Sequence, residues 1–185
     1  MNRFPGLILK FVMGNYINPS LGFSSFLLDQ ISSTCESLVN WKKKSILNFH
    51  NIYLSLFPIS LYLTQTEFSK LVQQSTATIQ IDSVFAKFKS VLYNTINILE
   101  LLSTLITYSS VELEDKVIIA FKIFDFDHSK KISLEEFGIM CKSFFKGIKI
   151  VTGFNTDTSQ IEEKILKKAY SLCETDSEGQ ITLAL

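Results

Sequence analysis

Apolar residues return at intervals of three and four positions along almost the whole chain, and this helical period constrains the fold more than any other feature. Residues 111–124 show it well, because Val117, Phe121 and Phe124 share one helix face and acids occupy the first turn. The 185 residues include only seven glycines and three prolines, so few positions interrupt the period. The sequence therefore predicts an all-α protein.

A loop rich in oxygen donors interrupts this period at residues 125–136, DFDHSKKISLEE. The helical pattern that follows the loop has its apolar positions on one side. These positions are Phe137, Met140, Cys141, Phe144 and Phe145. The predicted unit is therefore a helix, a twelve-residue loop and a second helix.

The oxygen donors of the loop fall at positions one, three, five, nine and twelve, which is the spacing at which a short turn surrounds Ca²⁺. Asp125 and Asp127 would each give one carboxylate oxygen, and Glu136 would give two. The remaining candidate ligands are the Ser129 hydroxyl, the Lys131 backbone carbonyl and Ser133, directly or through water. Together these groups form a shell of about seven oxygens.

Position six of the loop is Lys130, where the sharp turn requires positive φ and glycine is the residue with least strain. A lysine there costs about 1 kcal/mol. Lys130 and Lys131 also place two positive charges beside the ion. Because about 1.4 kcal/mol is a tenfold change in affinity, we expect a calcium dissociation constant of about 10⁻⁶ to 10⁻⁴ M. Magnesium should compete poorly, since the loop supplies too many ligands for octahedral geometry.

The loop and its two helices resemble the EF-hand proteins of the calmodulin superfamily, and the same frame recurs upstream around residues 89–100, KSVLYNTINILE. The frame around residues 125–136 consists of Phe121, Phe124, Ile132, Glu136 and Phe137. The residues at the same places upstream are Phe85, Phe88, Ile96, Glu100 and Leu101. The first, third and fifth loop positions are Lys89, Val91 and Tyr93, which offer no carboxylates. We expect this segment to be an EF-hand in shape that does not bind calcium.

Two further copies of the frame lie on either side of these. The first is carried by Leu63, Thr64, Glu67 and Phe68, with Leu54 and Phe57 as loop-entry residues if that loop is two residues short. The other is residues 174–185, ETDSEGQITLAL, with acids at positions one, three and five and Gly179 at position six. Its twelfth residue is Leu185, so the bidentate carboxylate is lost. Either the sequence is a fragment or something else completes this fourth hand.

The resemblance implies paired EF-hand helix-loop-helix lobes with short antiparallel loop bridges, because neither helix pair can bury its apolar face alone. The bridges join the residues at the eighth position of each loop, so the expected pairs are Leu63 with Ile96 and Ile132 with Ile181. The expected divisions are an N-terminal arm over residues 1–25, a degenerate pair of hands over 26–105, and a pair with one competent loop over 106–185.

Composition excludes several other classes of protein. Eighteen basic and eighteen acidic residues cancel, so no long-range field favours nucleic acid or an anionic membrane. The three cysteines form no CxxC pair, which favours a reducing, cytoplasmic compartment. The most apolar segment, residues 46–63, is broken by polar residues before it reaches a membrane span of about 20 residues. No nucleophile or two-histidine motif indicates an enzyme.

The resemblance leaves two functions open. In the first, calcium reorients the helices around residues 125–136, exposes an apolar groove and changes how a partner helix docks. In the second, the chain is a structural scaffold in which calcium is vestigial or a static brace. That pattern is similar to the degenerate EF-hand proteins of ciliary axonemes and doublet microtubules, which makes tubulin or another axonemal protein the expected partner. Three methionines against sixteen phenylalanines favour a fixed partner.

Overall fold

The computed structural model describes residues 37–38, 41–75, 77–153, 159–171, 173 and 175–182. The predicted N-terminal arm over residues 1–25 and the twelfth position of the fourth loop, Leu185, lie outside the described residues. Helices make up most of the described part, which confirms the all-α prediction. None of these helices combines the length and the apolar composition needed to span a membrane.

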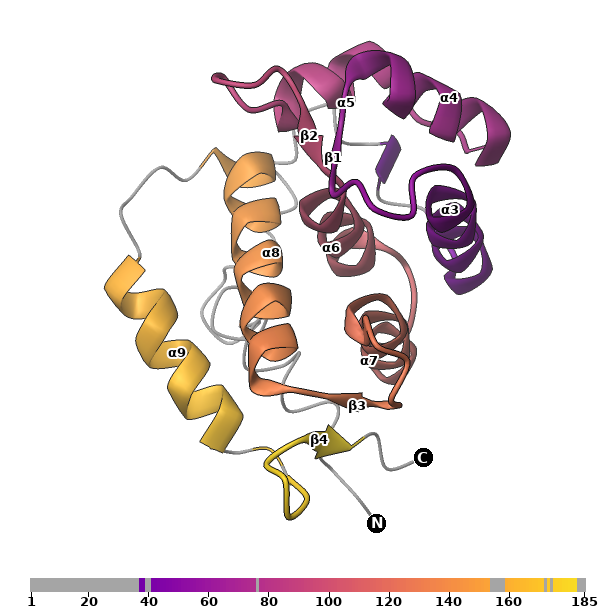
Figure 1. Ribbon diagram of the computed structural model, residues 1–185. Coiled ribbons are helices and arrows are strands. Elements are labelled where there is room, and N and C mark those ends of the chain that lie inside the picture. Colours follow the sequence, from indigo (N-terminus) through magenta and orange to yellow (C-terminus); the bar gives the residue numbers. More distant parts are fainter. Residues whose placement is uncertain are drawn as a thin grey trace.

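Four very short strands lie between and after the described helices (Figure 1). The first half of the chain contains α3 (Lys43–Leu56), β1 (Tyr62–Leu63), α4 (Gln65–Ser75), α5 (Ile81–Phe88), β2 (Ile96–Asn97) and α6 (Ile98–Tyr108). The second half contains α7 (Leu113–Phe124), β3 (Lys131–Ile132), α8 (Leu134–Thr152), α9 (Ser159–Ser171) and β4 (Ile181–Thr182). α8 ends at Gly153, whose φ of 69° gives the left-handed cap that glycine favours.

Two antiparallel sheets of two strands each lie apart from one another, β1–β2 in the upper part of the view and β3–β4 in the lower part (Figure 1). In the β1–β2 sheet, Leu63 pairs with Ile96. In the β3–β4 sheet, Ile132 pairs with Ile181. Both predicted bridging pairs are therefore confirmed. All four side chains are buried, so each bridge also contributes to the apolar core.

A continuous cluster of buried apolar side chains runs through both halves of the chain, from Leu38 to Ile181. α6 and α8 lie side by side, and α3 packs against both α4 and α7 (Figure 1). At the surface, Lys43 Nζ and Asp115 Oδ1 form a 2.6 Å ion pair that joins α3 to α7. The segments on either side of the predicted division near residue 105 thus share one core.

A glycine allows α8 to approach α6 closely. If Gly147 of α8 carried a Cβ atom, that atom would collide with the Thr104 hydroxyl and lie 2.8 Å from the Glu100 carbonyl oxygen. The Thr104 hydroxyl is itself occupied, because it donates to that same carbonyl at 2.8 Å. The contact between the two central helices therefore depends on the absence of a side chain at this position.

The only tryptophan of the sequence, Trp41, lies two residues before the first residue of α3. The Trp41 ring is buried and meets Phe49 edge to face, with ring centroids 5.4 Å apart. Its indole Nε1 donates to the Ser37 carbonyl at 3.0 Å. These contacts attach the chain before α3 to the core of the first half.

The entry to the first loop differs from the predicted frame. Leu54, which the frame places at the loop entry, is 37% exposed, whereas Tyr53 is buried and donates its hydroxyl to the Ser60 carbonyl at 2.9 Å. The buried stripe of α3 runs through Ile46, Phe49 and Tyr53 at intervals of three and four residues. Leu54 lies about 100° away from that stripe, so it cannot share its face.

Candidate metal centre

Residues 125–136 connect α7 directly to α8. Asp125 caps the end of α7, and its N–H still donates to the Phe121 carbonyl at 2.9 Å. At the other end of the loop, Ser133 is the N-cap of α8: its hydroxyl accepts from the Glu136 N–H at 3.2 Å, and Glu136 Oε2 accepts from the Ser133 N–H at 2.9 Å. This capping box fixes the position of the Glu136 side chain.

Three carboxylates converge inside the loop. One oxygen each of Asp125, Asp127 and Glu136 lies within 4.8 Å of the others. Because calcium–oxygen distances are about 2.3–2.6 Å, ligands on opposite sides of one ion are about 5 Å apart, and the observed spacing fits such an ion. Glu136 is only 8% exposed, whereas Asp127 is exposed, so the cluster is closed toward the protein and open toward solvent.

Two more predicted ligands lie with this cluster. The Ser129 hydroxyl is 3.4 Å from Asp125 Oδ1 and 3.4 Å from the Lys131 carbonyl oxygen. Ser133 behaves differently, because its hydroxyl donates to Glu136 Oε2 at 3.0 Å as part of the helix cap. The structure therefore brings most of the predicted ligands together and places Ser133 beside them, in contact with Glu136. All of these donors are oxygens, the ligand type that calcium prefers.

The backbone of the loop holds the acids in place. The Phe126 N–H donates to Glu136 Oε1 at 2.8 Å, and the Lys130 N–H donates to Asp125 Oδ2 at 3.0 Å. Hydrogen bonds from the hydroxyl and the backbone N–H of Ser129 hold the pKa of Asp127 below its usual value. Part of the arrangement that an ion would require is thus formed by the protein alone.

The sixth position of the loop has the backbone conformation that the sequence predicts. Lys130 has a φ of 63°, in the left-handed region. The sixth positions of two other loops share this conformation: Asn94 has a φ of 49° and Gly179 a φ of 75°. Glycine adopts it without strain and asparagine tolerates it, whereas lysine is strained by about 1 kcal/mol.

The sequence predicts that the charge of Lys131 weakens the site, whereas in the structure this ammonium has acidic partners. Its Nζ lies 2.7 Å from Asp176 Oδ2 and 3.8 Å from Glu178 Oε2, which are the third and fifth positions of the fourth loop. This contact raises the pKa of Lys131 and lowers that of Asp176. The β3–β4 bridge brings the two loops together, so the fourth loop neutralises the Lys131 ammonium.

The first loop, which precedes α4, repeats the capping box that ends the loop over residues 125–136. The N–H and hydroxyl of Thr64 both donate to Glu67 Oε2 at 2.8 Å, and the Glu67 N–H donates back to the Thr64 hydroxyl at 3.4 Å. Ser133 and Glu136 form the same set of hydrogen bonds. The two segments that were matched by sequence therefore share their local geometry.

The loop over residues 89–100 presents different chemistry at the matching positions. Lys89, Val91 and Tyr93 are exposed, and Glu100 forms an ion pair with Lys146 of α8 at 3.3 Å. Burial raises the pKa of Glu100, an effect that the neighbouring ammonium opposes. Within the part of the chain that the structure describes, no other group of three histidine, cysteine or acidic side chains converges as the cluster in residues 125–136 does.

Comparison with known proteins adds no family to this geometry. No protein-family model matches the chain, and no curated protein matches it.

Proposed function

We propose that the protein is an EF-hand protein that binds one calcium ion in the loop over residues 125–136 and docks a protein partner through apolar helix faces. The observation that carries the proposal is the convergence of the Asp125, Asp127 and Glu136 carboxylates within 4.8 Å. The Ser129 hydroxyl and the Lys131 carbonyl complete an oxygen donor set beside them. Hard oxygen ligands in this number and spacing favour calcium over transition metals.

Recurring local geometry supports the wider EF-hand frame. A left-handed sixth residue occurs in three loops, paired eighth residues join the loops two by two, and a capping box starts the helix after the first and third loops. These features also occur in loops that lack the complete set of acids found in residues 125–136. The shape of the hands therefore depends on backbone geometry and packing, and the capacity to bind calcium depends on the acids of one loop.

In this proposal the ion would connect α7 to α8. Asp125 directly follows α7, whereas Glu136 lies in the first turn of α8. Calcium held by both side chains would compensate their mutual repulsion and restrict the angle between the two helices. α8 also forms one wall of a largely apolar groove of about 590 Å³, lined from α9 by Glu163 and Leu166. A shift of α8 would change the shape of that groove for a partner helix.

The shared core favours a second candidate function, that of a structural scaffold. Because α3 packs on α7 and α6 packs on α8, neither helix next to the calcium loop can move without disturbing the first half of the molecule. Calcium would then be a static brace and partner binding would be permanent. The resemblance to axonemal EF-hand proteins makes tubulin or another axonemal protein the partner proposed for this function, in the cytoskeleton of the cilium.

Calorimetric titration with calcium, at physiological ionic strength and with magnesium present, tests the site. We expect one site with a dissociation constant of about 10⁻⁶ to 10⁻⁴ M. Glu136→Gln should abolish the binding heat, because it removes the negative charge and one of the two oxygens of a bidentate ligand. Glu135→Gln is the matched control, since Glu135 is exposed and is not among the three converging acids.

The same titration can contradict the proposal. Absence of binding heat in the unaltered protein, or equal binding by the Glu136→Gln protein, would exclude calcium binding at residues 125–136. Circular dichroism of the two variants before titration shows whether each has kept its helices, which matters because Glu136 also belongs to the capping box of α8.

A further inference from the structure

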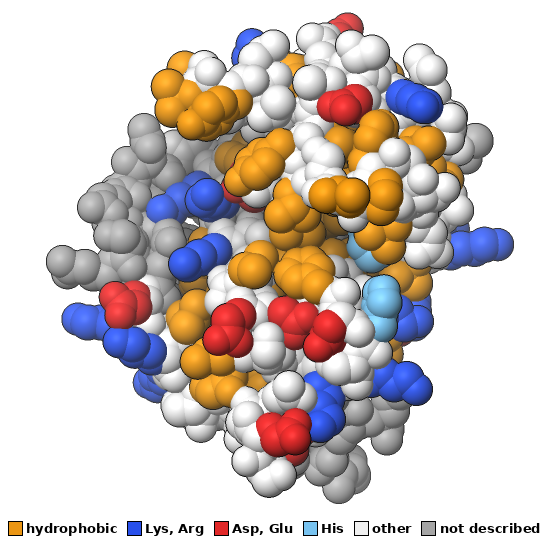
Figure 2. Space-filling view, viewed as in Figure 1, with side chains coloured by type: hydrophobic (Ala, Val, Ile, Leu, Met, Phe, Trp, Pro, Cys, Tyr) orange, Lys and Arg blue, Asp and Glu red, His pale blue; other side chains and the backbone are white. Residues whose placement is uncertain are grey.

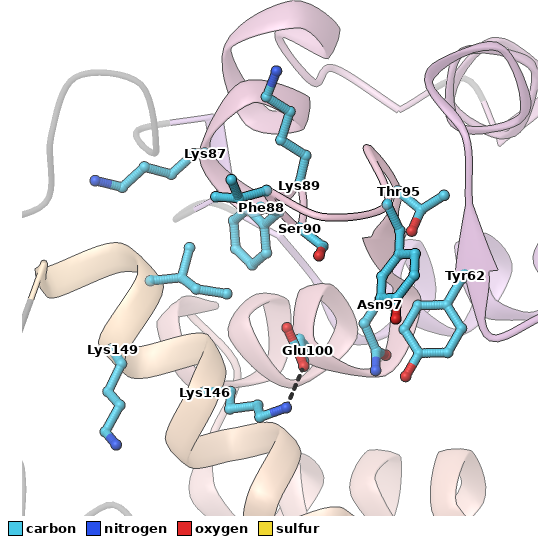
Figure 3. Close-up of a pocket in the computed structure, with 13 residues that line it drawn as sticks. Tyr62, Lys87, Phe88, Lys89, Ser90, Thr95, Asn97, Glu100, Lys146 and Lys149 are labelled. Atoms are coloured by element: carbon cyan, nitrogen blue, oxygen red, sulfur yellow. Dashed lines mark ion pairs between the residues drawn. The ribbon is translucent and has the colours of Figure 1, made fainter. Parts of the chain in front are cut away.

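A groove of about 870 Å³ lies away from the calcium loop, between the segment of residues 88–97 and α8 (Figure 3). Tyr62 of β1, Phe88 and Ile150 contribute apolar surface to it. None of the residues that line it belongs to the loop over residues 125–136. We call it the α5–α8 groove.

Exposed apolar side chains stand at the mouth of this groove. Val91 is 98% exposed, Leu92 84% and Tyr93 76%, and two of these three consecutive residues, Val91 and Tyr93, line the groove. Figure 2 shows apolar side chains gathered at the upper left, over the loop between α5 and β2. Single exposed apolar residues are ordinary, but a run of three beside a hollow marks an interaction surface.

The groove is also positively charged. Lys87 and Lys89 line it from α5 and the following loop, and Lys146 and Lys149 line it from α8 (Figure 3). Glu100 is the only acid among the described residues that line it, and it is paired with Lys146. Among the described lining residues, four lysines and one glutamate give a net positive charge, in a protein whose overall net charge is zero.

Two of the lysines lack a carboxylate partner among the described residues. Neither Lys87 nor Lys89 forms an ion pair with any carboxylate of the described residues, and both side chains are exposed. Both precede the exposed apolar run in sequence, with Lys89 two residues before Val91. Positive charge and apolar surface therefore occur together at the first, third and fifth loop positions, where a calcium-binding loop has acids.

We propose that the α5–α8 groove docks a segment of a partner protein that combines apolar side chains with carboxylates. Apolar groups of that segment cover Val91 and Tyr93, and its acids pair with Lys87 and Lys89. The lysines stand on both α5 and α8, on two sides of a hollow, so a segment lying in the groove meets both sets, whereas a flat bilayer does not. This segment belongs to the protein partner of the proposed function, and none of the proposed calcium ligands takes part in docking it.

Selection from a library of random peptides displayed on phage, with the full chain as bait, tests this proposal. We expect the enriched peptides to combine Asp or Glu with apolar residues. Their affinity is then measured by fluorescence anisotropy, both in chelator and in calcium. Lys87→Glu with Lys89→Glu should weaken binding about tenfold or more, and added salt should weaken binding to the unaltered protein.

Two further variants separate the contributions to binding. Val91→Ser with Tyr93→Ser should also weaken binding but leave its salt dependence in place. Lys70→Glu with Lys122→Glu is the matched control, because it reverses the same amount of charge at exposed lysines of α4 and α7 that do not line the groove. This control should retain the affinity of the unaltered protein for the selected peptides.

Several results would overturn the proposal: no enriched sequence, enriched peptides without acids, or equal affinity for the Lys87→Glu, Lys89→Glu protein. Sedimentation with vesicles of phosphatidylserine and phosphatidylcholine checks the alternative ligand, and vesicle binding that this charge-reversed protein loses would assign the groove to an anionic membrane. We expect the Glu136→Gln protein to bind the selected peptides as the unaltered protein does. The groove is then independent of the calcium site, and either proposal can fail while the other holds.

Discussion

Lys130 combines two effects in one residue of the proposed calcium-binding loop, a strained backbone and a positive charge beside three acids. Lys130→Gly removes both, so we expect it to strengthen calcium binding several-fold and to raise the free energy of unfolding without calcium by about 0.5–1 kcal/mol. Lys130→Ala removes the charge but keeps the Cβ atom. Calcium titration and urea unfolding of the pair separate the effects, and equal stability of the two variants would contradict the role of strain.

His50 makes the stability of the fold depend on pH. Burial, together with the charge of His128, lowers the pKa of His50 from 6.5 to about 4. The unfolded chain therefore takes up a proton as the pH falls below about 6.5, whereas the folded chain does so only near pH 4. We expect a loss of about 3 kcal/mol of stability between these values.

The control for this pH dependence is the second histidine. His50→Gln should flatten the stability profile between pH 6.5 and 4 measured by urea unfolding. His128→Gln should keep most of the slope, because the larger cause of the lowered pKa is burial of His50 itself. An unchanged profile in the His50→Gln protein would show that other groups dominate acid unfolding.

At the scale of secondary-structure elements, the contact of α6 with α8 depends on Gly147. Gly147→Ala forces a Cβ against Thr104 and the Glu100 carbonyl, and we expect it to lower the free energy of unfolding by about 1–3 kcal/mol. Gly138→Ala in the same helix is the control, because its Cβ would meet only Leu166 at 3.8 Å. Alanine's higher helix propensity should make that variant up to about 1 kcal/mol more stable. Equal stability of the two variants would show that α6 and α8 separate easily.

Elements with regular local patterns are predictable from this sequence, and contacts between distant segments are not. The helices on both sides of residues 125–136 have long apolar stripes, and the repeated frame also determines which eighth residues pair. The Lys131–Asp176 ion pair and the close approach at Gly147 have no local signal, because a single lysine or glycine is common in helical sequences. Tyr53 replaces Leu54 in the core because the phase of α3 is set by packing.

At the scale of the whole molecule, one core extends through both halves, and this limits how far calcium can change the surface. We expect a dye that fluoresces on apolar surfaces to give the same signal with and without calcium. Much of its binding should occur near Val91 and Tyr93, so Val91→Ser with Tyr93→Ser should lower the signal in both conditions. A strong rise in dye fluorescence with calcium would instead support a sensor that opens a groove.

The position of Trp41 gives the molecule an optical reporter in one place. It is the only indole in the sequence, and it contacts Phe49 of α3, the helix that also packs on α7. Its emission therefore reports on the core of the first half around Phe49, whereas circular dichroism averages over every helix. If the shared core melts as one cooperative unit, the two signals have the same midpoint. Different midpoints would mean that the halves come apart one after the other.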